Sequence, residues 1–197
     1  MPLTGGGDPV SGSEWVVESA TSILSRKPWI EVFEEHIRLA DGRLVDDFYT
    51  IRLRDFVVVA PVTDDGRLVM LEHYRHGPRR ITQSLPSGFV DEGESPGEAA
   101  RRELLEETGF AADEWSELGS YVVDGNRGCG LEHVFMATGA RRVAEVSGND
   151  LAPASVQSVT VEEAAERLRR GDISELASAS ALALAFLRIN TESKTGA

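Results

Sequence analysis

The stretch that decides the fold runs from Gly88 to Phe110. Gly88 is followed after five residues by Glu94, and after seven more by Arg102-Glu103-Leu104-Leu105-Glu106-Glu107-Thr108-Gly109-Phe110. At background residue frequencies, the fixed positions of this array match by accident on the order of once in 10⁹ starting points. The array is therefore a specific sign of one kind of functional site.

A helix is predicted to begin inside this stretch. Residues 95–98 read Ser-Pro-Gly-Glu, a capping box with proline at the first helical position. At 3.6 residues per turn, Glu103, Glu106 and Glu107 fall within an arc of roughly 100°. Like charges at this spacing destabilise a helix unless something compensates them, and carboxylate oxygens suit Mg²⁺ or Mn²⁺. The spacing predicts a divalent metal site on one helix face.

A solvated acidic helix is the alternative interpretation of the three glutamates taken alone. The glycines, Glu94 and Arg102 at their fixed distances favour the functional interpretation, because a plain acidic helix does not require them. Gly109 predicts a left-handed helix end, and Gly88 predicts a tight or strained turn before the helix. The predicted motif is a loop, a helix and a loop.

The whole array is identified as a complete Nudix box, the signature of enzymes that hydrolyse a nucleoside diphosphate linked to another group. The resemblance implies an α/β sandwich with a mixed central sheet. In this family the arginine matching Arg102 buttresses the box by pairing with its glutamates, and Glu94 is the expected partner. The resemblance also implies the metal ligands: Glu103, Glu107, Glu106 as a third ligand or auxiliary acid, and the Ser87 carbonyl.

Sequence outside the box resembles the ADP-ribose pyrophosphatase branch of the family. Residues 71–76 (Leu-Glu-His-Tyr-Arg-His) and 85–94 (Leu-Pro-Ser-Gly-Phe-Val-Asp-Glu-Gly-Glu) are similar to its Tyr-Arg and Leu-Pro-Ala-Gly elements. In that branch an extra N-terminal sheet forms a homodimer and helps to hold the adenine. The resemblance implies that Arg75 contacts the pyrophosphate. Trp29 is a candidate to stack on adenine, although a tryptophan beside a strand is also typical of a core or an interface.

A further glutamate in the family comes from a mobile loop after the box, where it binds metal or orients the attacking water. The stretch 124–133 is the only suitable loop, and Glu132 is the candidate; a solvated loop acid is the alternative. Ser84 stands where many ADP-ribose enzymes have glutamate, and Asp124-Gly125 stands where they often have proline. ADP-ribose, cleaved to AMP and ribose 5-phosphate, is the expected substrate, and a GDP- or UDP-linked sugar stays open.

Composition is that of a compact enzyme of 197 residues with 41% hydrophobic residues. A net charge of −13 argues against nucleic-acid polymers as partners, whereas a small anionic substrate stays compatible if metal and arginines invert the local field. The single Cys129 excludes an internal disulfide, and neither a signal pattern nor a membrane-spanning segment is visible. We therefore expect a cytoplasmic location.

Four regions are expected along the chain. Residues 1–14 are expected to be disordered and 191–197 to be a polar tail. Residues 15–55 are expected to form an antiparallel sheet, with a hairpin around Asp41-Gly42, and 56–190 the hydrolase domain. Within that domain we expect strands at 56–61, 68–72, 118–123 and 133–137, and helices at 161–170 and 173–187.

Three other functions stay as alternatives. Some Nudix domains sense nucleotides or serve as scaffolds without hydrolysis, but such domains commonly carry a broken box, and this box is intact. A nucleotide-pool sanitiser that acts on nucleoside triphosphates is disfavoured by the N-terminal sheet. Coenzyme A hydrolysis is disfavoured because the upstream motif of that branch is absent from the sequence.

Overall fold

The structure is a computed structural model that describes residues 14–147 and 154–195. The chain forms two compact units, an N-terminal unit of residues 1–54 and 122–130 and a main unit of residues 55–121 and 131–197. The first boundary lies one residue from the predicted one, whereas the contribution of 122–130 to the N-terminal unit was not predicted. Of the segment expected to be disordered, residues 1–13 lie outside the described part.

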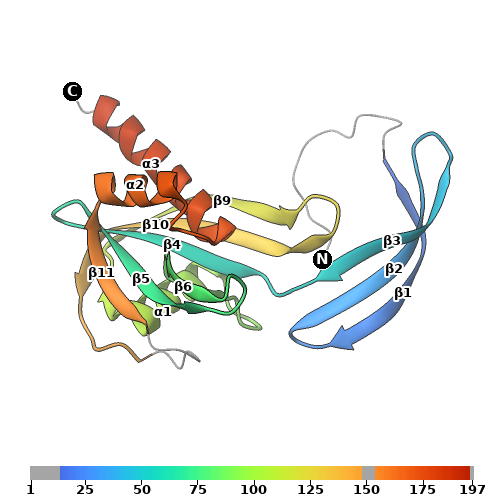
Figure 1. Ribbon diagram of the computed structural model, residues 1–197, viewed down its shortest axis with the longest axis horizontal. Coiled ribbons are helices and arrows are strands. Elements are labelled where there is room, and N and C mark those ends of the chain that lie inside the picture. Colours follow the sequence, from blue (N-terminus) through green and yellow to red (C-terminus); the bar gives the residue numbers. More distant parts are fainter. Residues whose placement is uncertain (1–13, 148–153, 196–197) are drawn as a thin grey trace. The chain divides into compact units, whose positions relative to one another are not determined.

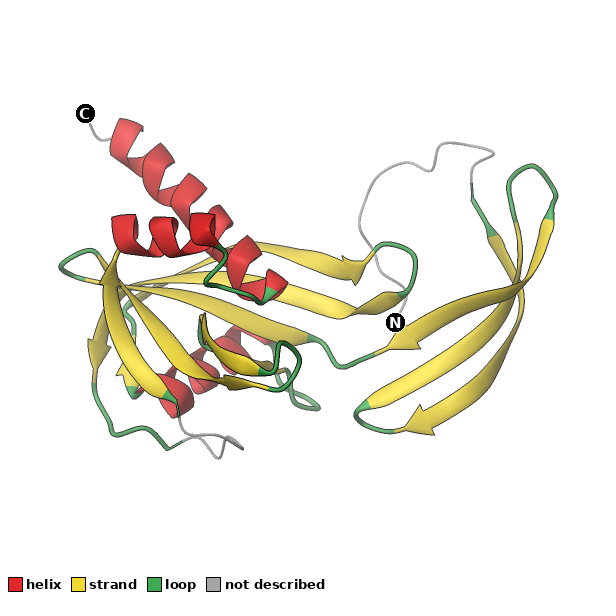
Figure 2. Ribbon diagram, in the orientation of Figure 1, coloured by secondary structure: helices red, strands yellow, loops and turns green. Residues whose placement is uncertain are grey.

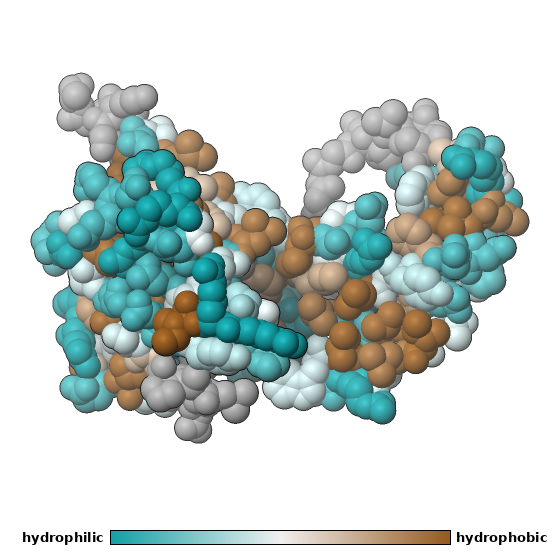
Figure 3. All heavy atoms as spheres, viewed as in Figure 1, coloured by the Kyte–Doolittle hydropathy of each residue, from teal (hydrophilic) through white to brown (hydrophobic). Residues whose placement is uncertain are grey.

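The N-terminal unit is a three-stranded antiparallel sheet in the order β1 (Val16–Arg26), β2 (Ile30–Arg38), β3 (Leu44–Arg52) (Figure 1). The predicted hairpin corresponds to β2 and β3, and the sheet gains β1 as a third strand. Apolar side chains lie on the visible surface of this unit (Figure 3). Its large exposed apolar side chains include Trp15, Val16, Val17, Ile23, Trp29 and Leu44.

The main unit contains a mixed sheet, which confirms the predicted α/β class. Its central order is β10 (Gly128–Arg142), β4 (Phe56–Thr63), β5 (Arg67–Arg75) and β11 (Ser155–Thr160), with β10 parallel to β4 and the other neighbours antiparallel. Short strands are β6 (Arg80–Ser84) on β5, β7 (Ser87–Phe89) on β4 and β8 (Phe110–Ala111) on β10, and the longer β9 (Glu114–Asp124) also pairs with β10.

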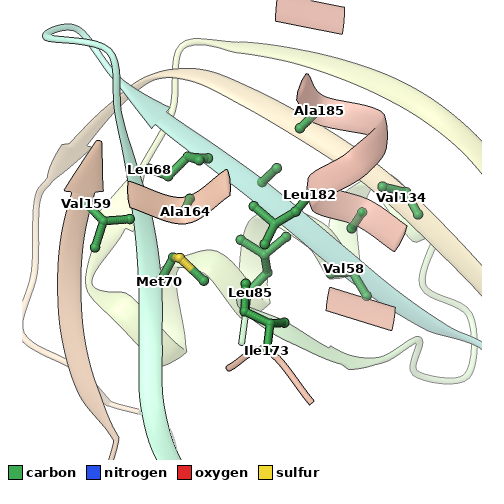
Figure 4. Packing of buried hydrophobic residues seen from close by; sticks show 12 residues of the cluster. Val58, Leu68, Met70, Leu85, Val134, Val159, Ala164, Ile173, Leu182 and Ala185 are labelled. Carbon is green, nitrogen blue, oxygen red and sulfur yellow. The ribbon is translucent and has the colours of Figure 1, made fainter. Parts of the chain in front are cut away.

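Helices cover both faces of this sheet, as Figure 2 shows: α1 (Pro96–Thr108) on one face, α2 (Val161–Arg170) and α3 (Leu176–Thr195) on the other. Strand β4 explains the two layers, because successive side chains of a strand point to opposite faces. Val57 and Val59 pack in one core with Leu104 of α1. Val58 packs in the second core with Leu182 of α3 (Figure 4).

Two element boundaries differ from prediction at the C-terminal end. Helix α3 begins at Leu176, three residues after the predicted start, and Ile173 lies buried in the second core within the segment that joins α2 to α3. The helix then continues to Thr195, into the predicted polar tail. Extending an existing helix costs little, and residues 176–195 contain no glycine or proline that would end it.

Candidate active site

Helix α1 begins and ends where its sequence signals predicted. The Ser95 hydroxyl accepts a hydrogen bond from the Glu98 N–H at 3.3 Å, and the Glu98 carboxylate accepts one from the Ser95 N–H at 2.8 Å. At the other end Gly109 adopts φ 75° and donates its N–H to the Leu105 carbonyl. Both caps fix the register of the helix, and therefore which side its glutamates present.

Gly88 is required for close approach rather than for an unusual backbone angle. It lies in strand β7, paired with Val57, and its φ is not in the left-handed region, so the predicted strained turn is absent at this position. A Cβ atom built on Gly88 would overlap the carboxyl carbon and both oxygens of Glu103. The first glycine of the box therefore makes room for the Glu103 carboxylate directly against the strand backbone.

Glu107, one turn further along α1, is also held against the backbone before the helix. It is 7% exposed, and its Oε2 accepts a hydrogen bond from the Ser87 N–H at 2.8 Å. Burial of a carboxylate is costly unless hydrogen bonds or cations compensate it. The structure thus places Glu107 beside Ser87, and a metal-ligating role of the Ser87 carbonyl stays a prediction.

Arg102 ties the box together, as expected for a buttress. It donates to both oxygens of Glu94, at 2.9 and 2.8 Å, which confirms the predicted partner. It also donates to Glu103 at 2.6 Å, to Glu106 at 3.3 Å and to the Phe89 carbonyl at 2.9 Å. The hydrogen bonds to Glu94 are the main reason that the pKa of Arg102 is raised above its ordinary value. Its positive charge compensates the acidic face of α1.

A cleft of about 430 Å³ opens beside these residues within the main unit. It brings together Glu103, Glu107 and Ser87 with Arg75 at the end of β5. Its full lining is Phe56, Arg75, Ser87, Gly88, Phe89, Glu103, Glu107, Glu175 and Ala177. Three carboxylates face one guanidinium, so the cleft wall is net negative before any cation binds.

Glu175 is the site residue that sequence reasoning missed. It lies in the segment between α2 and α3, and its Oε1 is 3.3 Å from Nε of Arg75. No spacing rule connects it to the box, because it comes 68 residues after Glu107 and reaches the cleft only through the tertiary fold. Its carboxylate neutralises Arg75, the side chain expected to contact the pyrophosphate.

Four predicted site residues do not line the cleft: Arg102, described above, and Glu106, Glu132 and Trp29. Glu106 is partly exposed and contacts Arg102. Glu132 lies in strand β10, paired with Phe56, rather than in the mobile loop that was expected; residues 125–127 alone form the turn between β9 and β10. Trp29 is 61% exposed in the turn between β1 and β2 of the N-terminal unit. Their catalytic or stacking roles stay predictions.

The carboxylate of Glu132 points to helix α3. It is 8% exposed and accepts a hydrogen bond from the Ser180 hydroxyl at 3.3 Å. Burial raises the pKa of Glu132, and the Ser180 hydrogen bond offsets part of that rise. Burial therefore favours the protonated form of this carboxyl.

The donor set of the cleft fits a hard divalent cation. Glu103 and Glu107 are one turn apart on α1, and both line the cleft with oxygen atoms of the type that Mg²⁺ and Mn²⁺ prefer. Within residues 14–147 and 154–195, no three Asp, Glu, His or Cys side chains converge closely enough to form a complete protein cage. Two carboxylates with water and substrate oxygens are the usual set for Mg²⁺.

Comparison with known proteins fits this geometry. Residues 52–177 match the family described as NUDIX domain, over more than half of the chain. The chain belongs to the NUDIX family. The match includes the box, the cleft and Arg75, and it starts close to the boundary between the two units.

Relatives of this Nudix chain include ADP-ribose pyrophosphatases of two bacteria. That of Mycobacterium tuberculosis (strain H37Rv) is 34% identical over 123 residues, 59% of this chain and 58% of the relative. That of Bacillus subtilis (strain 168) is 29% identical over 108 residues, 55% of this chain and 58% of the relative. The chain thus spans less than two thirds of the length of either relative.

A solved structure described as an ADP compounds hydrolase has the same fold. Its TM-score to this chain is 0.73 at 22% sequence identity, and the match covers 90% of this chain and 97% of that one. The matches confirm the predicted family and fold, and they support the prediction that this Nudix chain is an enzyme. No helix among the described residues is long and apolar enough to cross a membrane.

Proposed function

We propose that the chain is a metal-dependent pyrophosphohydrolase that cleaves ADP-ribose to AMP and ribose 5-phosphate. The proposal rests on one observation: Glu103, Glu107 and Arg75 line the same cleft, together with Gly88. Two carboxylates for a cation and one guanidinium for a phosphate are the groups that hydrolysis of a diphosphate requires. The names of the two bacterial relatives support ADP-ribose as the substrate.

Glu103 and Glu107 would hold the Mg²⁺ or Mn²⁺. When bound, the cation neutralises the diphosphate and lowers the pKa of a water molecule. The net negative cleft wall supports this requirement, because a substrate with two adjoining phosphates is repelled by three carboxylates. Glu106 is proposed as an auxiliary acid or third ligand, although its side chain now contacts Arg102.

Arg75 is proposed to bind the departing phosphate. In the present structure its Nε contacts Glu175, so the substrate must compete with that carboxylate for the guanidinium. Arg102 is proposed to act indirectly, because it donates hydrogen bonds to Glu94 and Glu103 but does not line the cleft. Glu132 stays a candidate for the metal ligand or the base that orients the attacking water, as the resemblance to the family implies.

Substrate choice beyond the diphosphate is the open part of this proposal. Ser84, one departure from the ADP-ribose pattern, is fully buried and its hydroxyl lies 2.9 Å from Nε2 of His73. Ser84 belongs to β6 and is paired with Leu71 of β5, and its burial supports a structural role for the substitution and keeps ADP-ribose as the proposed substrate. A GDP- or UDP-linked sugar is the alternative substrate.

We also propose that the enzyme is a cytoplasmic homodimer formed through the N-terminal sheet. Large exposed apolar side chains on this unit, including Trp15, Val16 and Leu44, support a protein interface. Trp29 of the same unit is proposed to stack on the adenine. Size-exclusion chromatography with light scattering tests the dimer: a mass of one chain at micromolar concentration contradicts it.

Product analysis with a substrate panel tests the proposed activity. The purified chain is incubated with Mg²⁺ or Mn²⁺ and ADP-ribose, GDP-mannose, UDP-glucose, NADH or a nucleoside triphosphate. We expect selective release of AMP from ADP-ribose. Turnover of another compound keeps the mechanism and corrects the substrate, whereas tight nucleotide binding without turnover of any compound favours the sensor alternative.

A further inference from the structure

A second cavity, of about 330 Å³, lies between β6, the edge of β5 and the C-terminal end of α2. It shares no lining residue with the catalytic cleft. Its lining is Glu72, Arg80, Ile81, Thr82, Gln83, Arg167, Arg170 and Asp172. We name it the arginine pocket. Its volume is at the lower end of the range of pockets that bind small molecules, about 300 to 1,000 Å³.

The charge of this pocket is opposite to that of the molecule. Three arginines and two carboxylates line it, which leaves one net positive charge in a chain whose net charge is −13. Arg170 is paired with Asp172 at 2.6 Å. Guanidinium groups gathered in a concave surface are the preferred protein donors for phosphate, because their planar N–H groups match its oxygens.

Two of the three guanidinium groups bind neutral acceptors. Arg167 donates to the side-chain oxygen of Gln157 at 3.1 Å, and Arg80 donates to the Gly171 carbonyl at 3.3 Å. Among the described residues, neither forms an ion pair within 4.0 Å. The two carboxylates of the pocket, Glu72 and Asp172, therefore leave both guanidinium groups available to a bound anion.

The pocket also contains acceptors for hydroxyl groups. The carboxylates of Glu72 and Asp172 line it together with the arginines. Glu72 accepts a hydrogen bond from Nε2 of Gln83 at 3.3 Å, and Asp172 pairs with Arg170 at 2.6 Å. Because an ionised carboxylate can accept about four hydrogen bonds, both side chains keep acceptor capacity for hydroxyl groups of a ligand.

The floor of the pocket is held in place before any ligand binds. The Thr82 hydroxyl lies 2.7 Å from that of Ser174 and 3.3 Å from the Asp172 carbonyl. Ile173, which lies between Asp172 and Ser174 in the sequence, is buried in the second core beside Leu85 (Figure 4). A preformed pocket loses less entropy on binding than a flexible surface does.

From these observations we propose that the arginine pocket binds the phosphate monoester of a small polyol. Its phosphate contacts Arg80, Arg167 and Arg170, and its hydroxyls face the carboxylates of Glu72 and Asp172. This site is distinct from the diphosphate site, and the inference does not depend on the proposed hydrolysis.

Calorimetric titration of the full chain in EDTA tests the proposal, because without a cation the negative catalytic cleft disfavours anions. The probes are glycerol 3-phosphate, inorganic phosphate and, as an uncharged match, glycerol. We expect saturable binding of one glycerol 3-phosphate per chain, weaker binding of inorganic phosphate, and none of glycerol. Absence of saturable binding of both phosphates at tens of millimolar overturns the proposal.

Matched variants locate the site. Arg167→Met is expected to weaken the binding of both phosphates about tenfold or more, as loss of a charge-assisted contact does. Arg169→Met is the control, because Arg169 lies on the same helix outside the pocket and pairs with Glu166. Equal weakening by both variants overturns the proposal, since it indicates diffuse attraction to the helix surface.

Two more variants are useful: one is a second test of the phosphate contacts, and the other tests the hydroxyl contacts. Arg80→Met removes an exposed side chain of β6, so it provides a second test if Arg167→Met fails to fold. Glu72→Met is expected to weaken the binding of glycerol 3-phosphate severalfold relative to that of inorganic phosphate, because it removes a hydroxyl acceptor and no phosphate donor. Binding that survives these changes and is lost in Arg75→Met places the anion in the catalytic cleft and contradicts the proposal.

Discussion

Replacing Gly88 with alanine tests how closely the box helix approaches the strand. The added Cβ would meet the Glu103 carboxyl at well under 3.0 Å, whereas carbon atoms in ordinary contact are about 3.5 to 4.0 Å apart. The carboxylate therefore has to move by about 1 Å or more. A displacement of this size in a catalytic group costs on the order of 100-fold in rate.

We expect Gly88→Ala to lower kcat for ADP-ribose about 100-fold and to change Tm little. The clash falls on the end of a side chain, which can rotate, and alanine is compatible with a strand position outside the left-handed region. Gly77→Ala is the control, because a Cβ there meets no atom within 4 Å and should leave the rate unchanged. Steady-state kinetics and differential scanning fluorimetry measure both effects. Near-wild-type kcat in Gly88→Ala would show that the rate does not depend on the position of the Glu103 carboxylate against the Gly88 backbone.

Three other substitutions probe stability. Arg102→Met, which leaves Glu94 and Glu103 without this partner, is expected to lower the free energy of unfolding by about 2 kcal/mol, against about 1 or less for the exposed Arg101→Met; equal urea midpoints contradict this. Leu104→Ala removes a fully buried side chain and should cost about 2 to 5 kcal/mol in the same assay, clearly more than Leu105→Ala. Burial raises the pKa of Glu132, so ionisation of this carboxyl disfavours the folded state. The wild type should therefore lose stability relative to Glu132→Gln as pH rises above about 4.5, by at most about 1.4 kcal/mol per pH unit, and a difference that does not change with pH contradicts the assignment.

Local signals in the sequence were enough to predict the box helix. The Ser95 capping box and Gly109 mark its ends, and both caps are present in the structure. The pairing of Arg102 with Glu94 was implied by the resemblance to the Nudix family rather than by a local signal. Helix α2 likewise begins after the capping residue Thr160 and ends before Gly171, at its predicted bounds.

Long-range contacts were beyond the reach of these signals. Glu175 enters the cleft because the segment between α2 and α3 returns to β5, and nothing in its own neighbourhood indicates this. Glu132 was expected in a loop, yet parallel pairing with β4 extends β10 through its position. Parallel pairing joins residues far apart in sequence, so no local pattern reports it.

Glu103 and Glu107 are proposed to hold the cation for cleavage of a diphosphate. Quantification of AMP and ribose 5-phosphate released from ADP-ribose by the wild type and by Glu107→Gln, with Mg²⁺ and with EDTA, tests this role. We predict stoichiometric release of both products by the wild type with Mg²⁺, none in EDTA, and a rate lower by orders of magnitude in a Glu107→Gln variant that stays folded. Wild-type turnover by Glu107→Gln, or turnover that persists in EDTA, would contradict the account.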